Sequence, residues 1–206
     1  GNDGATHHGL LDLAFLRPIP NMAIGAPMTA NDLRQMMRIA KDYDGPIAIR
    51  YPRGKSVNRT DLPPIVLGQA VCVKPGKEVA VLSIGAIGNT VAEAIQSMNI
   101  GKRNLFAHYD MRWLKPIDEY ILKEVVENFD TIVTVEDGMI NGGLGSAVAE
   151  YVSSRREARG ERREARVIRL GVNDQFVEHG STKELYELLK LDKEGICESL
   201  LQALEL

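Results

Sequence analysis

The chain has 206 residues, of which 44% are apolar and 26% are charged, and its formal net charge at pH 7 is −3. These values are typical of one large or two small globular domains, and the negative balance gives no basic field that would attract nucleic acid. No stretch approaches the roughly 18 uninterrupted apolar residues of a membrane helix, so we expect no membrane partner.

The first quarter of the chain is predicted to hold two short strands, at residues 21–25 and 47–51, with a helix between them. The helix begins at a capping-box-like sequence, Thr29 to Asp32. Asp44-Gly45-Pro46 is expected to end it. Four apolar side chains would share its buried face: Leu33, Met36, Met37 and Ala40.

Residues 54–65 (GKSVNRTDLPPI) predict a linker, because they are polar, contain proline and lack periodicity. Beyond them, strands are predicted at 66–73, 79–84, 105–108, 131–135 and 166–170, and helices at 118–128 and after Gly145. Three further helices are predicted from their apolar stripes. The first has the stripe Ile87, Val91, Ala94, Ile95 and Met98, and the last has Ile196, Leu200, Leu201 and Leu204. Between them, a capping box of Ser181 and Glu184 begins a helix with the stripe Leu185, Leu188 and Leu189.

This alternation of strands and helices predicts an α/β fold with a mostly parallel sheet. We divide the chain into a partial α/β domain (1–55), a linker (56–65) and a complete α/β domain (66–206). The charged segment RREARGERREAR (155–166) is expected to be a solvated helix end and loop, since its mixed charges and lack of aromatic residues do not suit nucleic acid. Cys72 and Cys197 are far apart in the sequence and indicate a reduced cytoplasmic protein with buried thiols.

The opening stretch GNDGATHHG is the first candidate site, because Asp3 and His7 lie among glycines where backbone can approach a ligand. A carboxylate and an imidazole can share hydrogen bonding and proton transfer at one ligand. By itself the stretch fits an ordinary turn with solvent-facing histidines better. Zinc binding is less favoured still, since His7 and His8 have no cysteine or carboxylate at ligand spacing.

Two further stretches could bind an anion. Arg53 lies in RYPRG, just beyond a predicted strand, where ligands of open α/β sheets bind, although a surface arginine is an equal alternative. The glycine-rich loop from Glu136 to Ser146 precedes a helix and could cradle phosphate. It lacks the Walker lysine and the Rossmann spacing, so packing against a neighbouring domain or subunit is favoured.

Taken together, these stretches resemble the 1-deoxy-D-xylulose-5-phosphate synthase family, relatives of transketolase that use thiamine diphosphate. GNDGATHHG resembles the family's G-A-D-G-x-T-H-x-G loop, and DGPIAIRYPRG, DMRWLKPID, VTVEDGMINGGLGSAV and LGVNDQFVEHGS follow in the family's order. The resemblance implies that residues 1–55 are the C-terminal portion of the pyrimidine-binding domain. Residues 66–206 would then be the transketolase C-terminal-like domain.

The resemblance also implies a reaction. Pyruvate would lose carbon dioxide, and the remaining two-carbon unit would add to D-glyceraldehyde 3-phosphate, giving a precursor of isoprenoids, thiamine and pyridoxal. The full-length enzyme would be a homodimer with thiamine diphosphate and Mg²⁺. His7 matches a histidine that contacts substrate and assists proton transfer, Asp3 an aspartate that binds acceptor hydroxyls, and Arg53 an arginine that holds the acceptor phosphate. Arg50 is expected to be structural, and His8 matches a variable position.

The family places its cofactor carboxylate and its magnesium site upstream of the region that this chain matches. Asn2-Asp3-Gly4 with Asn31 does not fit the magnesium motif, so we expect the chain alone to be inactive and to bind no cofactor tightly. Two alternatives stay open. One is another enzyme of the superfamily, a transketolase or the beta subunit of a 2-oxo acid decarboxylase, and the other is an interaction module without catalysis.

Overall fold

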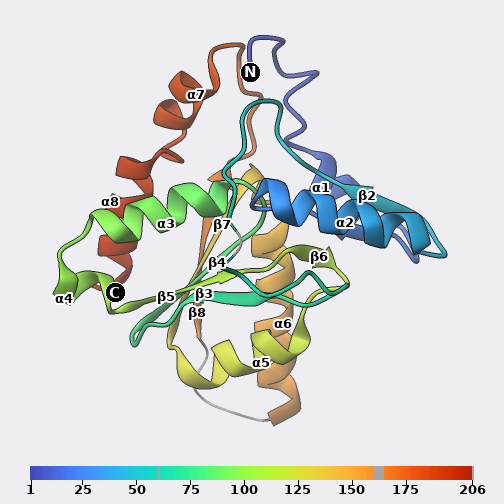
Figure 1. Cartoon of the computed structure of the whole chain (residues 1–206). Coiled ribbons are helices and arrows are strands. Elements are labelled where there is room, and N and C mark those ends of the chain that lie inside the picture. The colour runs from blue at the N-terminus through green and yellow to red at the C-terminus, as the bar shows by residue number, and fades with distance from the viewer. Residues whose placement is uncertain (60, 160–164, 206) are drawn as a thin grey trace.

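The structure, a computed structural model, describes residues 1–59, 61–159 and 165–205. Its larger sheet has the strand order β3-β5-β4-β7-β8 (Figure 1). Strands β4, β5, β7 and β8 run parallel, and β3 pairs antiparallel with β5 at one edge. The α/β class and the mostly parallel sheet are therefore confirmed. The five strands are β3 (Val71–Lys74), β4 (Val79–Ser83), β5 (Phe106–Asp110), β7 (Thr131–Met139) and β8 (Arg166–Val172).

Helices cover both faces of this sheet (Figure 1). On one face lie α1 (Asp12–Leu16), α5 (Glu119–Asn128) and α6 (Leu144–Arg159). On the other lie α3 (Ile87–Ser97), α7 (Thr182–Leu188) and α8 (Lys193–Ala203), with the short α4 (Ile100–Arg103) after α3. Ala80 and Leu82 of β4 belong to the first core, whereas Val79 and Val81 belong to the second. Successive strand residues face opposite sides, so one central strand supplies two cores.

A smaller sheet joins the two predicted domains. Its order is β2 (Ile47–Ile49), β1 (Ala23–Gly25) and β6 (Trp113–Lys115), with β1 parallel to β2 and antiparallel to β6. Helix α2 (Ala30–Asp42) lies between β1 and β2 in the chain and begins at the predicted capping box. There the Asp32 amide donates to Thr29 Oγ1 at 3.1 Å, and the Thr29 amide donates to Asp32 Oδ2 at 3.0 Å.

Some sequence predictions are wrong in detail. The strand expected over 66–73 begins only at Val71, because Gly68 turns the chain with a φ of +73°. Met37 is 55% exposed and Leu188 is 72% exposed, so neither belongs to the buried stripe predicted for its helix. Met36 is the buried apolar residue of α2 that packs in the core, against Trp113, and Met37 points away from that contact. Leu188 is the last residue of α7 and lies beyond the part of the helix that packs on the core.

The two thiols are free, but the prediction that both are buried is wrong. Cys72 is exposed because it lies on the edge strand β3, and Cys197 is half-buried on α8. Part of the charged segment 155–166 lies outside the described residues, between the end of α6 and the start of β8. Among the residues that the structure describes, no helix is long and apolar enough to cross a membrane.

Candidate functional site

The opening loop packs against the segment that precedes α7, and both lie at the top of Figure 1. His8 Nε2 lies 3.1 Å from the carbonyl oxygen of Val177, and the Gly180 amide donates to the Gly1 carbonyl at 3.2 Å. Gly4 has a φ of +85°, a conformation that favours glycine. Two segments far apart in the sequence are thereby joined at one edge of the molecule.

Within this loop, Asp3 approaches Arg53, which follows strand β2. Nη1 of Arg53 lies 3.7 Å from Oδ2 of Asp3, and the two side chains are 95% and 63% exposed. His7 is also exposed, and its Nδ1 lies 2.9 Å from the hydroxyl of Thr6. The structure thus pairs two of the three predicted site residues and places the third on the same loop, with all three open to solvent.

Beneath the loop, Arg50 forms a network that the sequence did not predict. Its Nε donates to Asp12 Oδ2 at 2.9 Å, and its Nη1 donates to Asp137 Oδ1. Its Nη2 donates to the Gly9 carbonyl at 3.2 Å and to the Asp137 carbonyl at 2.9 Å. The hydroxyl of Tyr186 on α7 completes the network by donating to Asp137 Oδ2 at 3.0 Å. The two carboxylates raise the pKa of Arg50 against the opposing effect of its burial.

The glycine-rich loop after β7 holds a buried carboxylate. Glu136 accepts hydrogen bonds from the amides of Leu144 and Gly145 in the first turn of α6, each at 2.8 Å. Burial raises the pKa of Glu136 to about 7, although both amides favour its charged form. A Cβ at position 143 would lie 1.9 Å from Glu136 Oε2, so Gly143 leaves room for the carboxylate. These two N–H groups are therefore engaged by Glu136 and are not free to cradle a phosphate, whereas packing of the loop against a neighbouring domain or subunit stays a prediction.

A second polar cluster lies inside the molecule, at the end of β5. His108 Nε2 is 2.8 Å from the hydroxyl of Ser83, and burial lowers the pKa of His108 to about 3. The Asp110 carboxylate accepts from the Arg112 amide at 3.1 Å, and burial raises the pKa of Asp110 to about 7. The Arg112 side chain donates to the carbonyls of Pro63 and Pro64 at 2.9 and 3.2 Å. Arg112 thereby fastens the linker, and the whole cluster is closed to solvent, which argues against an exposed site here.

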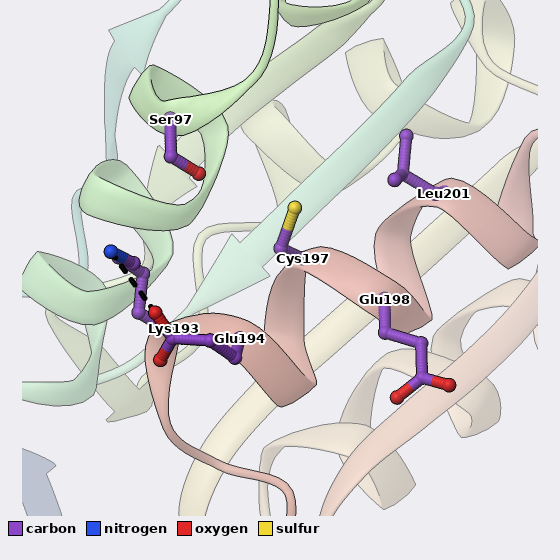
Figure 2. Close-up of a pocket in the computed structure, with 6 residues that line it drawn as sticks. All are labelled: Ser97, Lys193, Glu194, Cys197, Glu198 and Leu201. Carbon is purple, nitrogen blue, oxygen red and sulfur yellow. Dashed lines mark ion pairs between the residues drawn. The ribbon is translucent and has the colours of Figure 1, made fainter.

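A groove lies between α3 and α8 (Figure 2). It encloses about 460 Å³. Two of its charged groups pair with each other, Lys193 Nζ lying 3.0 Å from Glu194 Oε1. Its residues come from elements other than those that carry the predicted site: Ser97, Lys193, Glu194, Cys197, Glu198 and Leu201. The groove and the loop with Asp3 are thus separate features.

Sequence reasoning missed the partners that hold the loop. The DLAFL sequence around Asp12 forms only one short helix, which is too short to show periodicity. Asp137 falls within the predicted glycine-rich loop and Tyr186 within a predicted amphipathic helix, and neither local pattern indicates a partner for these side chains. The signal in the sequence was Arg50 itself, because a charged residue directly after an apolar strand needs partners where it is buried.

Two family models match the chain. The model described as "Transketolase, C-terminal domain" matches residues 68–196, and that described as "Transketolase, pyrimidine binding domain" matches residues 1–57. Among curated proteins, the 1-deoxy-D-xylulose-5-phosphate synthase of Bacteroides thetaiotaomicron is 44% identical over 100% of this chain and 32% of its own length. The protein of the same name from Parabacteroides distasonis is 45% identical over 97% of this chain and 31% of its own length. The resemblance inferred from the motifs is confirmed, and the chain spans about a third of these relatives.

Solved structures show the same fold. A structure described as "Split gene transketolase, inactive beta4 tetramer" superposes with a TM-score of 0.83 at 31% identity, covering 98% of this chain and 64% of that one. A transketolase mutant from Pichia stipitis gives a TM-score of 0.71 at 17% identity, covering 100% of this chain and 28% of that one. The first is similar in sequence and in fold, and the second supports the fold alone.

Proposed function

Because the chain belongs to the transketolase family and within it resembles the 1-deoxy-D-xylulose-5-phosphate synthases, we propose that it forms the acceptor-binding part of such a synthase. The reaction would join a two-carbon unit from pyruvate, released with loss of carbon dioxide, to D-glyceraldehyde 3-phosphate. The observation that carries this proposal is the pair of Asp3 and Arg53, which brings the opening loop and the exit of β2 to one exposed place.

The three side chains would divide the work by their chemistry. The planar guanidinium of Arg53 suits the phosphate of the acceptor, because it can donate two parallel hydrogen bonds to it. The carboxylate of Asp3 can accept hydrogen bonds from acceptor hydroxyls, since an ionised carboxylate only accepts. The imidazole of His7 can pass a proton to or from the acceptor while the two neighbours hold it.

Thiamine diphosphate would supply the carbanion chemistry of the donor half-reaction. The residues present here do not fit that cofactor by themselves. Among the described residues, no group of three or more His, Cys, Asp or Glu could hold a metal ion for its diphosphate. The buried carboxylate Glu136 is already bound by the amides of Leu144 and Gly145. We therefore derive no step through the cofactor and infer that its carboxylate and Mg²⁺ partners lie in the part of the relatives that this chain does not match.

We further infer that the chain by itself assembles with copies of itself and does not turn over. The split-gene transketolase to which it is similar over 98% of its length is described as an inactive tetramer. A cytoplasmic location and a homodimer in the full-length enzyme stay predictions. Sedimentation of the purified chain, together with an assay of pyruvate decarboxylation, tests both parts, and carbon dioxide release by this chain alone would contradict the second.

The reaction itself is tested in the whole enzyme with pyruvate labelled with ¹³C at C1 and with D-glyceraldehyde 3-phosphate. We expect labelled carbon dioxide and one new ketose phosphate in equal amounts. A ketose phosphate replaces pyruvate in the parallel assay, because transketolases are also among the similar structures. Turnover with the ketose phosphate and none with pyruvate would reject the synthase in favour of a transketolase.

A further inference from the structure

We propose that Arg50 is a positioning residue that holds the opening loop and the strand exit with Arg53 in a fixed relation. The effect of Arg50 on acceptor binding rests on the proposed function. The fixed position of the loop rests only on contacts within the chain. Arg50 is largely shielded from any substrate, since its side chain is only 17% exposed. Arg53, three residues further along the same strand exit, is 95% exposed.

The contacts of Arg50 come from three separate segments. Nε donates to Asp12 in α1, and Nη2 donates to the carbonyl of Gly9 in the opening loop. Nη1 and Nη2 donate to the side chain and the carbonyl of Asp137 in β7. One planar group thus connects the loop that carries Asp3, the end of β2 and the central sheet. A flexible ammonium has neither the reach nor the fixed fork needed for these four bonds.

Two further bonds make the anchor rigid. The Met139 amide donates to the Leu10 carbonyl at 2.9 Å, which ties the end of the loop to β7 directly. Tyr186 donates to the second oxygen of Asp137 and thereby fixes the carboxylate that Arg50 grips. Because Asp12 and Asp137 are both acidic, removing the guanidinium would leave two partly buried carboxylates facing each other without their cation. The loop would then separate from β7.

The first test measures the loop in the chain itself. In Arg50→Lys, hydrogen exchange of the Met139 amide should rise tenfold or more, whereas exchange at Val81 and Val133 in the middle of the sheet should stay within twofold. Arg17→Lys is the matched control, because Arg17 forms an ion pair with Glu150 on α6 and serves no part of this network. Equal acceleration at all three amides would overturn the proposal, since Arg50 would then only stabilise the fold. No change at Met139 would overturn it as well.

Tyr186→Phe provides a milder variant in case Arg50→Lys does not fold. It removes a single hydroxyl from Asp137 and should raise Met139 exchange in the same direction by a smaller factor, about two- to fivefold. Unchanged exchange in this variant, with Arg50→Lys unfolded, would count against a shared network and overturn the proposal.

The second test uses the whole enzyme and compares D-glyceraldehyde 3-phosphate with D-glyceraldehyde as acceptor. We expect Arg50→Lys to lower the preference in kcat/KM for the phosphorylated acceptor by about tenfold, because Arg53 no longer lies opposite Asp3 in a fixed position. Faster Met139 exchange with an unchanged preference would support the positioning of the loop and reject the role proposed for Arg53. The two proposals therefore fail in different ways.

Discussion

Asp3 and Arg53 lie 3.7 Å apart between Oδ2 and Nη1, although α1, β1, α2 and β2 lie between the loop and the strand exit that carry them. Both side chains are mostly exposed, so their mutual attraction contributes little to stability. Their closeness instead creates a place where a positive and a negative group face the same solvent region. An acceptor with a phosphate at one end and hydroxyls along its chain has the complementary pattern.

This arrangement predicts a specific effect of Arg53→Met in the whole enzyme. The KM for D-glyceraldehyde 3-phosphate should rise roughly 10- to 100-fold, because hydrogen bonds to a charged group are worth about 1.5–3 kcal/mol. Activity with unphosphorylated D-glyceraldehyde should change little. Steady-state kinetics with both acceptors measures this, and Arg17→Met serves as a control that removes an arginine paired with Glu150. A uniform loss with both acceptors would argue against phosphate binding by Arg53.

Asp3→Ala should behave differently from Arg53→Met. Without the carboxylate, both acceptors lose a partner for their hydroxyls, so KM should rise about tenfold for each of them. The ratio between the phosphorylated and the unphosphorylated acceptor should stay nearly constant. If the phosphorylated acceptor alone is affected, Asp3 acts by orienting Arg53 and does not itself bind hydroxyls.

Sequence motifs predicted the candidate residues of this site but not the contacts that hold them in place. Asp3, His7 and Arg53 stand in short motifs whose residue types already suggest their chemistry. The bonds of Arg50 to Asp12, Gly9 and Asp137 join segments that are distant in the sequence, and no local pattern encodes such pairings. The same reason explains β6, a three-residue strand whose pairing with β1 depends on tertiary contact.

Gly143 predicts a stability effect inside the glycine-rich loop. A methyl group there would overlap the Glu136 carboxylate, at 1.9 Å from Oε2, and would push it away from the amides of Leu144 and Gly145. Gly143→Ala should therefore lower the free energy of unfolding by about 2–4 kcal/mol, the cost of two buried charge-assisted bonds. Urea unfolding followed by circular dichroism measures the loss. Gly101→Ala is the control, since its nearest new contact would be an ordinary 3.5 Å, and an equal loss in both variants would contradict the explanation.

Asp110 predicts a pH dependence of stability. Burial raises its pKa from 3.8 to about 7 in the folded state, against the attraction of Arg112 and Arg59, and Asp32 acts in the same direction as burial. Between these two values the folded state holds the proton that the unfolded state has lost, so this group's contribution to stability falls as pH rises from about 4 to 7. The contribution of Asp110 to the free energy of unfolding changes by at most about 1.4 kcal/mol per pH unit.

Asp110→Asn should remove this contribution. We expect its free energy of unfolding, measured in urea at pH 4.5, 5.5, 6.5 and 7.5, to fall less steeply with pH than that of the unchanged chain. Asp174→Asn provides the control, because Asp174 is exposed on the segment before α7. Identical slopes for the unchanged chain and for Asp110→Asn would show that Asp110 is ionised throughout this range.

The fold was predictable where local signals were strong. The capping box at Thr29 and the apolar stripe of α3 both lie where the sequence placed them. The errors at Met37 and Leu188 have a common cause, because periodicity locates an apolar face but not how widely a neighbour covers it. Both cysteines illustrate the same point, since their exposure depends on β3 being an edge strand and on the groove beside α8.

The contact between Gly25 and Trp113 gives the last prediction, because it joins the two predicted domains. Gly25 pairs with Trp113 across β1 and β6, and a Cβ at position 25 would lie 2.8 Å from Trp113 Cζ3 and 3.3 Å from Met36 Sδ. Trp113 is fully buried and cannot retreat without disturbing its packing with Met36 and Ile65. Gly25→Ala should therefore destabilise the chain by about 1–3 kcal/mol, as overpacking of a core does.

Trp113 is the single tryptophan of the chain, so its fluorescence reports this junction directly. In Gly25→Ala we expect the emission to shift to longer wavelength and the urea midpoint to fall, both relative to Gly101→Ala. A lower midpoint with unchanged emission would place the strain elsewhere than at Trp113. If the junction loosens while the five-stranded sheet persists, two unfolding transitions should replace one, because β6 would no longer hold β1 and β2 to the larger unit.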